Sequence, residues 1–546
     1  MRRPTPPPID WKPDRSSPTP LVEQIVSHVC EQASSGAWPI GTRLPSQRAL
    51  AEHYGVNRST VTAAIEELTG YGIVAGARGA GTRIVSNTWS LMLPKAPGWT
   101  GHVSDGPFHA NNATIRTINR MEYADGITRM GTGEIDPRLF PHEMWRQVAG
   151  EAAAEIDTFG YPPPEGLPML REAIAAHMRT GGVNCSSEQV LVTSGALQAL
   201  QLISVSLLPP DTTVLTESPS YIASLQVFQS AGIRLAGVPM DEGGLRIDML
   251  HGMLGVNSRS ERTGAPDGTH RMDETDGTDD AMLRAMLAAA KANAGTGPSS
   301  HTSAPRTSVA ALYTIPTNHN PTGVTMSDAH RRELLTYCEA ARLPIIEDCA
   351  YQELCFDAAT PMPLKAMDRT GTVIMLGSAS KTLAPGLRIG WIVADEPIVQ
   401  RLADVKMQMD YGASTLSQWV FARFLTSGLH DEYVTGLREE LRRRRDAALA
   451  SLERWFTGLA HWRHPTGGFY IWLTFDRPVR TERLFRAALE RGILLNPGDM
   501  YGAWIEQDAV PGSDNGPRDS NSLRLSYSYT TPEEFSEAAR TLASLL

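Results

Sequence analysis

The chain has 546 residues, which is more than one hydrophobic core usually supports and predicts two to four domains. Hydrophobic residues make up 41% and charged residues 20% of the sequence, and no run of about 18 apolar residues occurs, so no membrane-spanning helix is expected. Five scattered cysteines without zinc-ligand spacing, and two N-terminal arginines with no apolar run behind them, argue against a secreted protein and predict a cytoplasmic one.

Residues 1–18 contain six prolines and predict a disordered arm. In residues 19–86, apolar positions at helical spacing predict three helices: Pro20 to Gly36, "QRALAEHYG" and "TVTAAIEELTGYG". We expect Ser46 to cap the second helix and Gly55 to end it. The Gly-rich stretch "IVAGARGAGTRIV" then predicts a β-hairpin. This order of elements is typical of a winged helix-turn-helix.

The arginines of residues 19–86 suit a DNA-binding surface, although the net charge of −10 does not itself indicate one. Arg58, Ser59 and Thr60 begin the third helix, and the first residues of a recognition helix meet base edges. Arg43 and Arg48 lie where phosphates would pass, and Arg guanidinium groups are suited to phosphate contacts. A small helical interaction domain with ordinary surface arginines is the alternative.

The stretch from "PLVEQIVSHV" to "GARGAGTRIV" resembles the DNA-binding domain of GntR-type regulators over its whole length, and "SGAWPIGTRLPSQRALAEHYGVNRSTV" is its most specific part. The resemblance implies binding to a double-stranded DNA operator. It places the following residues near DNA: Arg43, Ser46, Arg48, Arg58, Ser59, Thr60, Arg78, Gly79 and Gly81.

Residues 87–122 carry several prolines and glycines without a clear period and predict a linker. From residue 123 to residue 546, strand-like apolar runs such as "QVLVTSG" and "LPIIEDCA" alternate with helical patterns. That alternation predicts an α/β domain with a mostly parallel sheet. Residues 257–308 are rich in Gly, Ser, Thr, Asp and Pro, and predict a largely disordered insertion with one short helical patch.

The stretch "SASKTLAPGLRIGW" holds one lysine in a setting that would suit pyridoxal 5′-phosphate. An amine can form a Schiff base with the aldehyde of that cofactor. Ser378, Ser380 and Arg388 offer hydroxyls and a guanidinium for its phosphate, and the N–H groups of Gly195 and Ala196 would begin a helix. The amine itself belongs to Lys381.

Other candidate residues surround the expected ring. Asp348 ends a predicted strand and can keep a pyridine nitrogen protonated. Tyr351 and Asn320 can reach the phenolic oxygen, and Tyr221 can stack on the ring face. Arg524 can bind a carboxylate of a substrate or effector through two hydrogen bonds. Taken singly, each of these residues has an ordinary structural explanation, so the argument depends on their joint occurrence.

The blocks "VTSGALQAL", "ESPSY", "PTNHNPTGV", "IEDCAYQEL", "SASKTLAPGLRIGW", "PTGGFYIWL" and "NSLRLSYS" resemble those of the fold type I, class I/II aminotransferases. The resemblance implies a Schiff base on Lys381 and a homodimer whose sites lie at the interface. It implies phosphate contacts from the amides after Ser194 and, across the interface, from Tyr161. It also implies the roles given above to the other ring, phosphate and carboxylate residues.

The two halves together resemble MocR-type regulators, in which a GntR-type domain precedes an aminotransferase-like domain. This predicts a multidomain chain, with a small α+β winged helix-turn-helix before a large α/β domain of the fold type I transferases. It implies a regulator that senses an amino compound, an amino acid or the vitamin B6 pool. An active aminotransferase with an accessory DNA-binding domain is the alternative, since "NHNPTG" is closer to true aminotransferases than the "HQ" of many MocR-type sequences.

Overall fold

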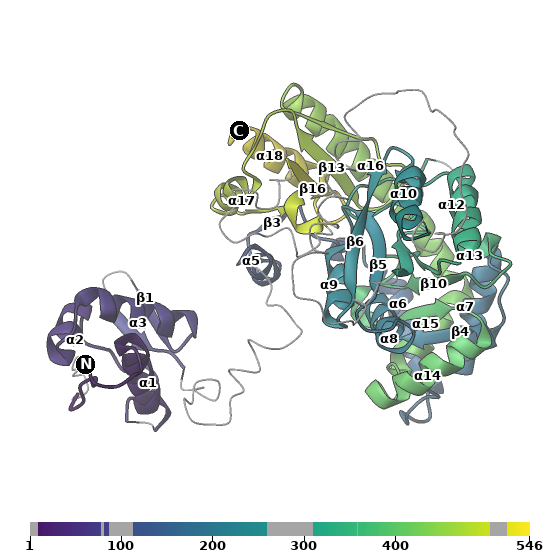
Figure 1. Cartoon of the computed structure of the whole chain (residues 1–546). Coiled ribbons are helices and arrows are strands. Elements are labelled where there is room, and N and C mark those ends of the chain that lie inside the picture. The colour runs from purple at the N-terminus through teal and green to yellow at the C-terminus, as the bar shows by residue number, and fades with distance from the viewer. Residues whose placement is uncertain are drawn as a thin grey trace, which may run out of the picture. The chain divides into compact units, whose positions relative to one another are not determined.

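The computed structural model describes residues 9–35, 37–77, 81–86, 113–258, 309–357, 359–502 and 521–546. The chain divides into a small unit, Met1–Pro107, and a large unit, Phe108–Leu546 (Figure 1). Each unit has a hydrophobic core of its own. None of the helices in these ranges is both long and apolar enough to cross a lipid bilayer.

The small unit contains three helices followed by a two-stranded antiparallel sheet, as the sequence predicts. Ser46 caps the second helix, because its Oγ accepts the N–H of Ala49 at 3.2 Å, and Gly55 ends that helix with a φ of +66°. The elements are α1 (Leu21–Ser34), α2 (Gln47–Tyr54), α3 (Arg58–Gly70), β1 (Val74–Ala77) and β2 (Gly81–Ile84).

The structure describes residues 9–18 of the predicted arm, and these residues contact the three-helix part of the small unit. The indole of Trp11 stacks on the imidazole of His28, with ring centroids 4.3 Å apart, and meets the ring of Tyr54 edge-on. Arg15 donates a hydrogen bond to the carbonyl of Gly55 at 2.6 Å. One large aromatic side chain stabilises this segment despite its proline content, because burying it removes a large apolar area from water.

The large unit is built on an eight-stranded mixed sheet in the order β4-β11-β10-β9-β8-β5-β6-β7. Six of its strands run parallel, whereas β11 and β7 are antiparallel to their neighbours. The strands are β4 (Val190–Thr193), β5 (Thr213–Ser218), β6 (Arg234–Asp241), β7 (Gly244–Leu245), β8 (Val309–Thr314), β9 (Ile345–Asp348), β10 (Val373–Ser378) and β11 (Gly390–Val393).

Helices cover both faces of this sheet, because its strands are apolar on both sides. Leu191 packs with α8, α9 and α14 on one face, whereas its neighbours Val190 and Val192 pack with α6, α7 and α15 on the other. These helices, with others of the unit, are α6 (His142–Glu155), α7 (Pro168–Thr180), α8 (Ala196–Ser206), α9 (Ile222–Ser230), α10 (Ile247–Ser258), α12 (Asp328–Ala341), α13 (Leu364–Met367), α14 (Glu396–Asp410) and α15 (Thr415–Ser427).

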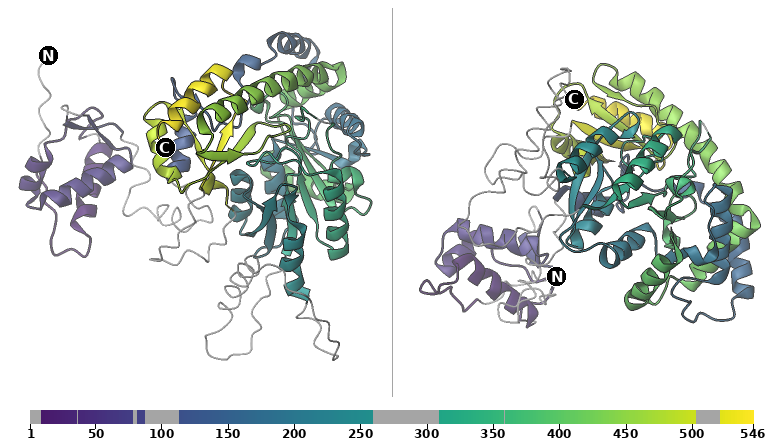
Figure 2. Two further views of the ribbon diagram at one scale, coloured as in Figure 1. Left: turned by 90° about the horizontal axis from the view of Figure 1, so that it is seen from above. Right: turned by 45° about the vertical axis from the view of Figure 1, so that its right-hand side comes forward.

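A second, four-stranded antiparallel sheet in the order β12-β13-β16-β15 forms the C-terminal part. The helices α16 and α18 run side by side next to it (Figures 1 and 2). A two-residue strand, β3, pairs with β14 and joins the start of the unit to this part. The elements are α16 (Leu429–Phe456), β12 (Ala460–Trp462), β13 (Tyr470–Phe475), α17 (Thr481–Leu489), β14 (Ile493–Leu494), β15 (Asn496–Pro497), β16 (Ser522–Ser526), α18 (Pro532–Ala543) and β3 (Thr128–Arg129), with 3₁₀ turns η1 (Pro137–Leu139), η2 (Ser187–Gln189), η3 (Pro385–Leu387) and η4 (Gly498–Tyr501).

Two predicted irregular segments are only partly described. The predicted linker, residues 87–122, ends in the helix α5 (Ala113–Met121), so the prediction of a linker is wrong there. Ile118 in this helix is buried in the core of the C-terminal part, and that burial stabilises the helix. Residues 87–112 lie outside the described residues. Of the predicted insertion, only the end of α10 is described, and residues 259–308 also lie outside.

Candidate ligand-binding site and nucleic-acid interface

The lysine of the candidate site lies in the turn that follows β10. The Nζ of Lys381 donates a hydrogen bond to the carbonyl of Gly133 at 2.6 Å and lies 5.9 Å from the ring centre of Tyr351. The side chain is half-buried. In the parallel register, Leu376 of β10 lies opposite Asp348 of β9, so the amine and this carboxylate follow the same edge of the sheet. That edge is where α/β sheets commonly bind ligands.

The carboxylate of Asp348 is buried and held by two donors. Its Oδ2 accepts a hydrogen bond from the hydroxyl of Tyr313 at 2.8 Å, and its Oδ1 accepts the N–H of Ala350 at 3.0 Å. Burial raises the pKa of Asp348, while these hydrogen bonds and the charge of Lys381 act in the opposite direction. The two donors therefore fix the orientation of the carboxylate and favour its charged form.

A pair of tyrosines links the lysine to the C-terminal part. The hydroxyls of Tyr351 and Tyr470 lie 2.9 Å apart and form a hydrogen bond. Burial raises the pKa of Tyr351 well above its ordinary value, so this phenol stays protonated near neutral pH. A Cβ added to Gly133 would lie 2.5 Å from the hydroxyl of Tyr470, and this contact requires glycine beside the lysine.

The guanidinium of Arg524 lies at the centre of the same cluster. It is buried, with Nη1 donating to Oδ1 of Asn320 at 2.8 Å and Nη2 donating to the carbonyl of Gly131 at 2.5 Å. It also lies 4.2 Å from the ring centre of Tyr470 and 5.0 Å from that of Tyr501. Among the described residues its Nε has no hydrogen-bond partner. A buried guanidinium with a free donor is suited to bind a carboxylate.

The predicted phosphate contacts gather at the N-terminus of α8. Arg388, at a φ of +52°, donates from Nη2 to the carbonyl of Ser194 at 2.8 Å. Gly195 precedes the helix with a φ of +96°, and a Cβ there would lie 2.8 Å from the same nitrogen. The helix itself begins at Ala196. The N–H of Ser194, however, donates to Oε1 of Gln198, so it is occupied within the chain.

The other predicted residues of the site differ from one another in burial and in contacts. Ser378 is buried and its Oγ accepts the N–H of Ser380 at 3.2 Å, close to the lysine turn. Tyr221 stands before α9 and is half-buried, and burial raises its pKa. Tyr161 is 85% exposed, with its ring 5.3 Å from that of Tyr411.

Sequence reasoning missed the aromatic and backbone parts of this cluster. Tyr470 lies within "PTGGFYIWL", a block that carried the resemblance without giving this tyrosine a role. Tyr313 lies in a strand and shows no motif, although a polar hydroxyl in an apolar strand suggests a buried partner. The carbonyls of Gly131 and Gly133 carry no side-chain signal at all.

Most of the predicted DNA contacts of the small unit lie in α2 and α3 or directly before these helices. Arg58 and Ser59 begin α3 and are exposed, and Thr60 beside them is half-buried. Arg43, Ser46 and Arg48 are exposed before and in α2. The side chains of Arg43, Arg48 and Arg58 form no ion pair with another described residue. In addition, the predicted Arg78 and Gly79 lie outside the described residues, while Gly81 begins β2 with a φ of +77°.

Gly81 also explains how the hairpin and the preceding turn come together. A Cβ added to Gly81 would lie 2.9 Å from Nε of Arg43, and a bridge joins Arg43 to Arg83. The Arg83 guanidinium donates to the carbonyl of Gly41 at 3.0 Å, so this arginine is used inside the unit. Arg43 is thus held beside the hairpin while its charge stays exposed.

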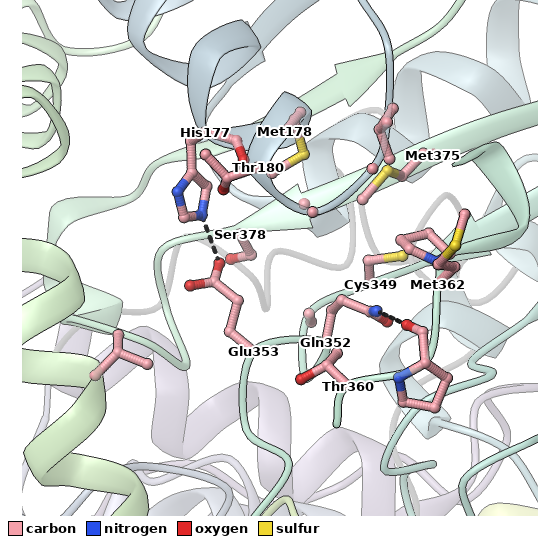
Figure 3. Close-up of a pocket in the computed structure, with 18 of the residues that line it drawn as sticks. His177, Met178, Thr180, Cys349, Gln352, Glu353, Thr360, Met362, Met375 and Ser378 are labelled. Carbon is pink, nitrogen blue, oxygen red and sulfur yellow. Dashed lines mark hydrogen bonds and ion pairs between the residues drawn. The ribbon is translucent and has the colours of Figure 1, made fainter. Parts of the chain in front are cut away.

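A cavity of about 540 Å³ lies elsewhere in the large unit, lined by α7, the turn after β9 and the start of α16. Ser378 and Cys349 line it, but Lys381 and Arg524 do not. Figure 3 shows His177 and Glu353 pointing toward one another on its wall. This cavity is therefore distinct from the cluster around the lysine.

Two family profiles match the chain. "Aminotransferase class I and II" matches residues 126–254 and 301–542, and "Bacterial regulatory proteins, gntR family" matches residues 21–84. The chain is 41% identical over 522 residues to the uncharacterized HTH-type transcriptional regulator YisV of Bacillus subtilis, covering 95% of both chains. It is 31% identical to the HTH-type transcriptional regulator NorG of Staphylococcus aureus, covering 91% of this chain and 97% of NorG.

Solved structures resemble the large unit. The kynurenine aminotransferase of Pyrococcus horikoshii gives a TM-score of 0.66 at 26% identity, covering 80% of this chain and 94% of that one. LysN, an alpha-aminoadipate aminotransferase of Thermus thermophilus, gives a TM-score of 0.64 at 27% identity, covering 82% and 97%. The fold is thus that of the aminotransferases, and in this chain the gntR match, residues 21–84, precedes it.

Proposed function

Because this chain belongs to the family of transcriptional regulators that join a GntR-type helix-turn-helix to an aminotransferase class I and II domain, we propose that its large domain binds pyridoxal 5′-phosphate and senses an amino compound or amino acid. The observation that supports this most directly is the meeting of the Lys381 amine, the Asp348 carboxylate and the Arg524 guanidinium at one cluster. DNA binding by the small unit would make the cytoplasm its place of action.

The residues present fit this cofactor. Lys381 would hold it covalently, Asp348 would face the ring nitrogen, and Arg388 with Ser378 and Ser380 would face the phosphate. When bound, pyridoxal phosphate supplies an aldehyde that captures primary amines and a ring that withdraws electrons. Gly195 supports the fit, because a side chain there would collide with Arg388. We assign Asn320, Tyr351 and Tyr221 to the ring, and Ser194, Gly195 and Ala196 to the phosphate.

Arg524 would select ligands that carry a carboxylate. In the present structure its two Nη atoms donate to Asn320 and to the carbonyl of Gly131, whereas its Nε is free among the described residues. An incoming carboxylate would replace one of these two bonds and use the free donor, so binding would shift the position of Asn320. Burial of the guanidinium strengthens such a pair, because the surroundings screen the charges weakly.

The small unit would bind an operator through the exposed arginines at α2 and α3. Arg58 would read a base edge, with Ser59 and Thr60 beside it, whereas Arg43, Ser46 and Arg48 would contact phosphates. Arg78, Gly79 and Gly81 of the hairpin would lie near the backbone. A ligand in the large unit can regulate this binding only if it has different affinities for two arrangements of the DNA-binding units.

We further propose that the regulator is a homodimer in which Tyr161 serves the site of the second chain. The support is the 85% exposure of this tyrosine, which leaves its hydroxyl available to a partner. Sedimentation should give a dimer, and Tyr161→Phe should weaken cofactor retention without changing the assembly. A monomer that retains the cofactor fully would overturn this part of the proposal.

The test of the main proposal uses the full chain with added pyridoxal phosphate. We expect an absorption band of the bound cofactor that a primary amine changes, and a parallel change in the affinity for DNA from the upstream region of its own gene. If amines change the absorption band but never the affinity for DNA, the proposal that the large domain acts as a sensor is wrong. A protein that binds no DNA segment near its own gene would contradict the regulatory role.

An active aminotransferase is the second candidate. The completeness of the ligand set favours it, including Asn320 with its bond to Arg524, as does the likeness to solved aminotransferases. Sustained turnover of an amino acid with a 2-oxo acid, over many cycles per chain, would establish this activity. A single half-reaction that stops after one equivalent supports sensing alone.

A further inference from the structure

Three side chains far apart in sequence meet beside the cavity, and two of them, His177 and Glu353, line it. His177 comes from α7, Glu353 from the turn after β9, and His430 from the first turn of α16. Their ligand atoms all lie within 4.8 Å of one another. Among the described residues, this is the one group of three or more histidine, cysteine and acidic side chains with such spacing. Nothing in the proposed function uses it.

The bonds within this His–Glu–His cluster leave one atom without a partner. Nε2 of His177 lies 3.1 Å from Oε1 of Glu353, which is a hydrogen bond (Figure 3). Nε2 of His430 lies 3.3 Å from Oγ1 of Thr382, the residue after the lysine. Nδ1 of His430 has no hydrogen-bond partner, although the side chain is only 1% exposed. A buried polar atom without a partner costs about 1–3 kcal/mol, so it calls for an explanation.

The surroundings of that atom are rich in negative charge. Nδ1 of His430 faces Oε2 of Glu353 at 3.8 Å and Oδ1 of Asp431 at 3.7 Å, both beyond hydrogen-bonding distance. If Nε2 donates to Thr382, then Nδ1 presents a lone pair toward two carboxylates. A cation between these groups would satisfy all of them.

We propose that His177, Glu353 and His430 bind one zinc ion, with the cavity supplying the remaining coordination positions. Zinc binds imidazole nitrogens at about 2.0–2.1 Å and carboxylate oxygens at about 2.0–2.2 Å, so tetrahedral ligand atoms lie roughly 3.3 Å apart. Nε2 of His177 lies 3.1 Å from Oε1 of Glu353, and Nδ1 of His430 lies 3.8 Å from its Oε2, so each imidazole faces its own carboxylate oxygen at a separation close to that value. The two imidazole rings stand at 87° to one another, with their centroids 5.3 Å apart.

The choice of zinc follows from the ligand types. Imidazole suits zinc, whereas magnesium and calcium prefer oxygen ligands alone. Thr382 bonded to the far nitrogen of His430 is the kind of outer partner that orients a metal-ligating histidine. Asp431 lines the cavity and could provide a fourth ligand, and a water from the cavity could do the same. Arg438 also lines it, and its Nε donates to the backbone carbonyl of Glu353 at 2.5 Å rather than to the carboxylate.

The test is equilibrium dialysis of the full chain, stripped with a chelator and kept reduced, against zinc alone. We expect one zinc ion per chain, and a loss of affinity of at least tenfold in His430→Gln and His177→Gln. His461→Gln is the matched control, because His461 is exposed and pairs with one carboxylate, Asp476, at 2.9 Å. Lys381→Ala should bind zinc normally, so failure of the cofactor proposal would not imitate failure of this one.

A second measurement avoids substitutions altogether. Cobalt in place of zinc should give the visible absorption of a tetrahedral site with nitrogen and oxygen ligands, without the charge-transfer band of a thiolate. That band would assign the ion to cysteine instead, with Cys349 of the same cavity the first candidate, and would overturn the proposal. Absence of zinc binding, or equal binding by the two histidine variants and the control, would overturn it as well.

Discussion

The arginines of the two units differ in how they are used. In the small unit, Arg43, Arg48 and Arg58 are exposed and form no ion pair with a described residue. In the large unit, Arg444 is 4% exposed, and all of its donor groups are used: Nη2 binds Asp136 at 2.8 Å, Nε binds Glu440 at 2.7 Å, and Nη1 donates to two backbone carbonyls.

This difference separates charges kept for a partner from charges used to hold the fold. An exposed, unpaired guanidinium costs little in the free protein and can exchange water for a phosphate when DNA binds. A buried guanidinium must be paired within the chain, because an unpaired buried charge is strongly destabilising. Arg524 stands between the two cases, since it is buried yet keeps one free donor among the described residues.

Substitution of Lys381 should have the largest effect on the large unit and the smallest effect on the small unit. Lys381→Ala should abolish covalent cofactor binding entirely, because it removes the only atom proposed to form that bond, while basal DNA binding by the small unit remains measurable. Absorption spectra and borohydride reduction followed by peptide mass analysis measure the first, and operator titration measures the second. Lys365→Ala, which removes a lysine paired with Asp368 at 3.0 Å, is the control and should keep the band. A band that survives in Lys381→Ala would move the covalent bond to another amine.

Removing a structural arginine should instead affect stability. Arg444→Ala takes from the buried Asp136 one of its two guanidinium partners, while Arg138 stays 2.8 Å from it, so we expect a loss of about 1.5–3 kcal/mol in the free energy of unfolding of the large unit. Its neighbour Arg443 is exposed, and its one ion pair among the described residues is with Glu440 at 2.8 Å, so Arg443→Ala should cost at most about 1 kcal/mol. Denaturant titration of both variants measures the contrast. Equal losses would show that burial does not distinguish these two neighbours.

Replacing Arg58, an exposed arginine proposed to contact DNA, should weaken DNA binding and leave stability almost unchanged. Arg58→Ala should weaken operator binding by about 1–3 kcal/mol if the side chain contacts a base, and change unfolding by no more than about 0.5 kcal/mol. Operator titrations at several salt concentrations measure the loss. Arg540→Ala removes the same charge from the large unit and should leave DNA binding unchanged. Unaltered operator affinity in Arg58→Ala would remove this arginine from the DNA interface.

Much of the fold and of the lysine cluster could be predicted, because the residues that specify these features lie close together in the sequence. Capping by Ser46 and the left-handed Gly55 are local properties that a few residues specify. The alternation of strands and helices specified the large sheet, and Lys381, Asp348 and Arg524 stand in blocks that are contiguous in sequence. The positions that were predicted are therefore those for which neighbouring residues carry the information.

The rest depends on contacts between distant segments. The proline-rich arm is held by contacts of Trp11 with His28 and Tyr54, and the helix that contains Ile118 lies against the core of the C-terminal part. The His–Glu–His cluster joins positions 177, 353 and 430, which share no motif. Composition and periodicity describe a segment alone, so they do not report such partners.

Two buried tyrosines, Tyr54 in the small unit and Tyr351 in the large one, differ in whether their hydroxyls have a hydrogen-bond partner within the described part of the chain. Tyr351 shares a hydrogen bond with Tyr470, whereas the hydroxyl of Tyr54 in the small unit is buried without a partner among the described residues. Burial raises the pKa of Tyr54 to about 12, above the value near 10 of an unfolded chain. The folded small unit thus retains this proton longer, and the stability that it contributes is present below pH 10 and is lost as the pH rises through about 12.

Tyr54→Phe should remove that alkaline loss and leave stability near pH 7 unchanged or raised by about 1 kcal/mol, because it deletes an unpaired buried hydroxyl. Calorimetry of the full chain measures this in the transition that operator DNA shifts. Tyr123→Phe is the control, since Tyr123 is 83% exposed and belongs to the large unit. A variant that is clearly destabilised at neutral pH would mean that the Tyr54 hydroxyl has a partner in solution, and the contrast with Tyr351 would then disappear.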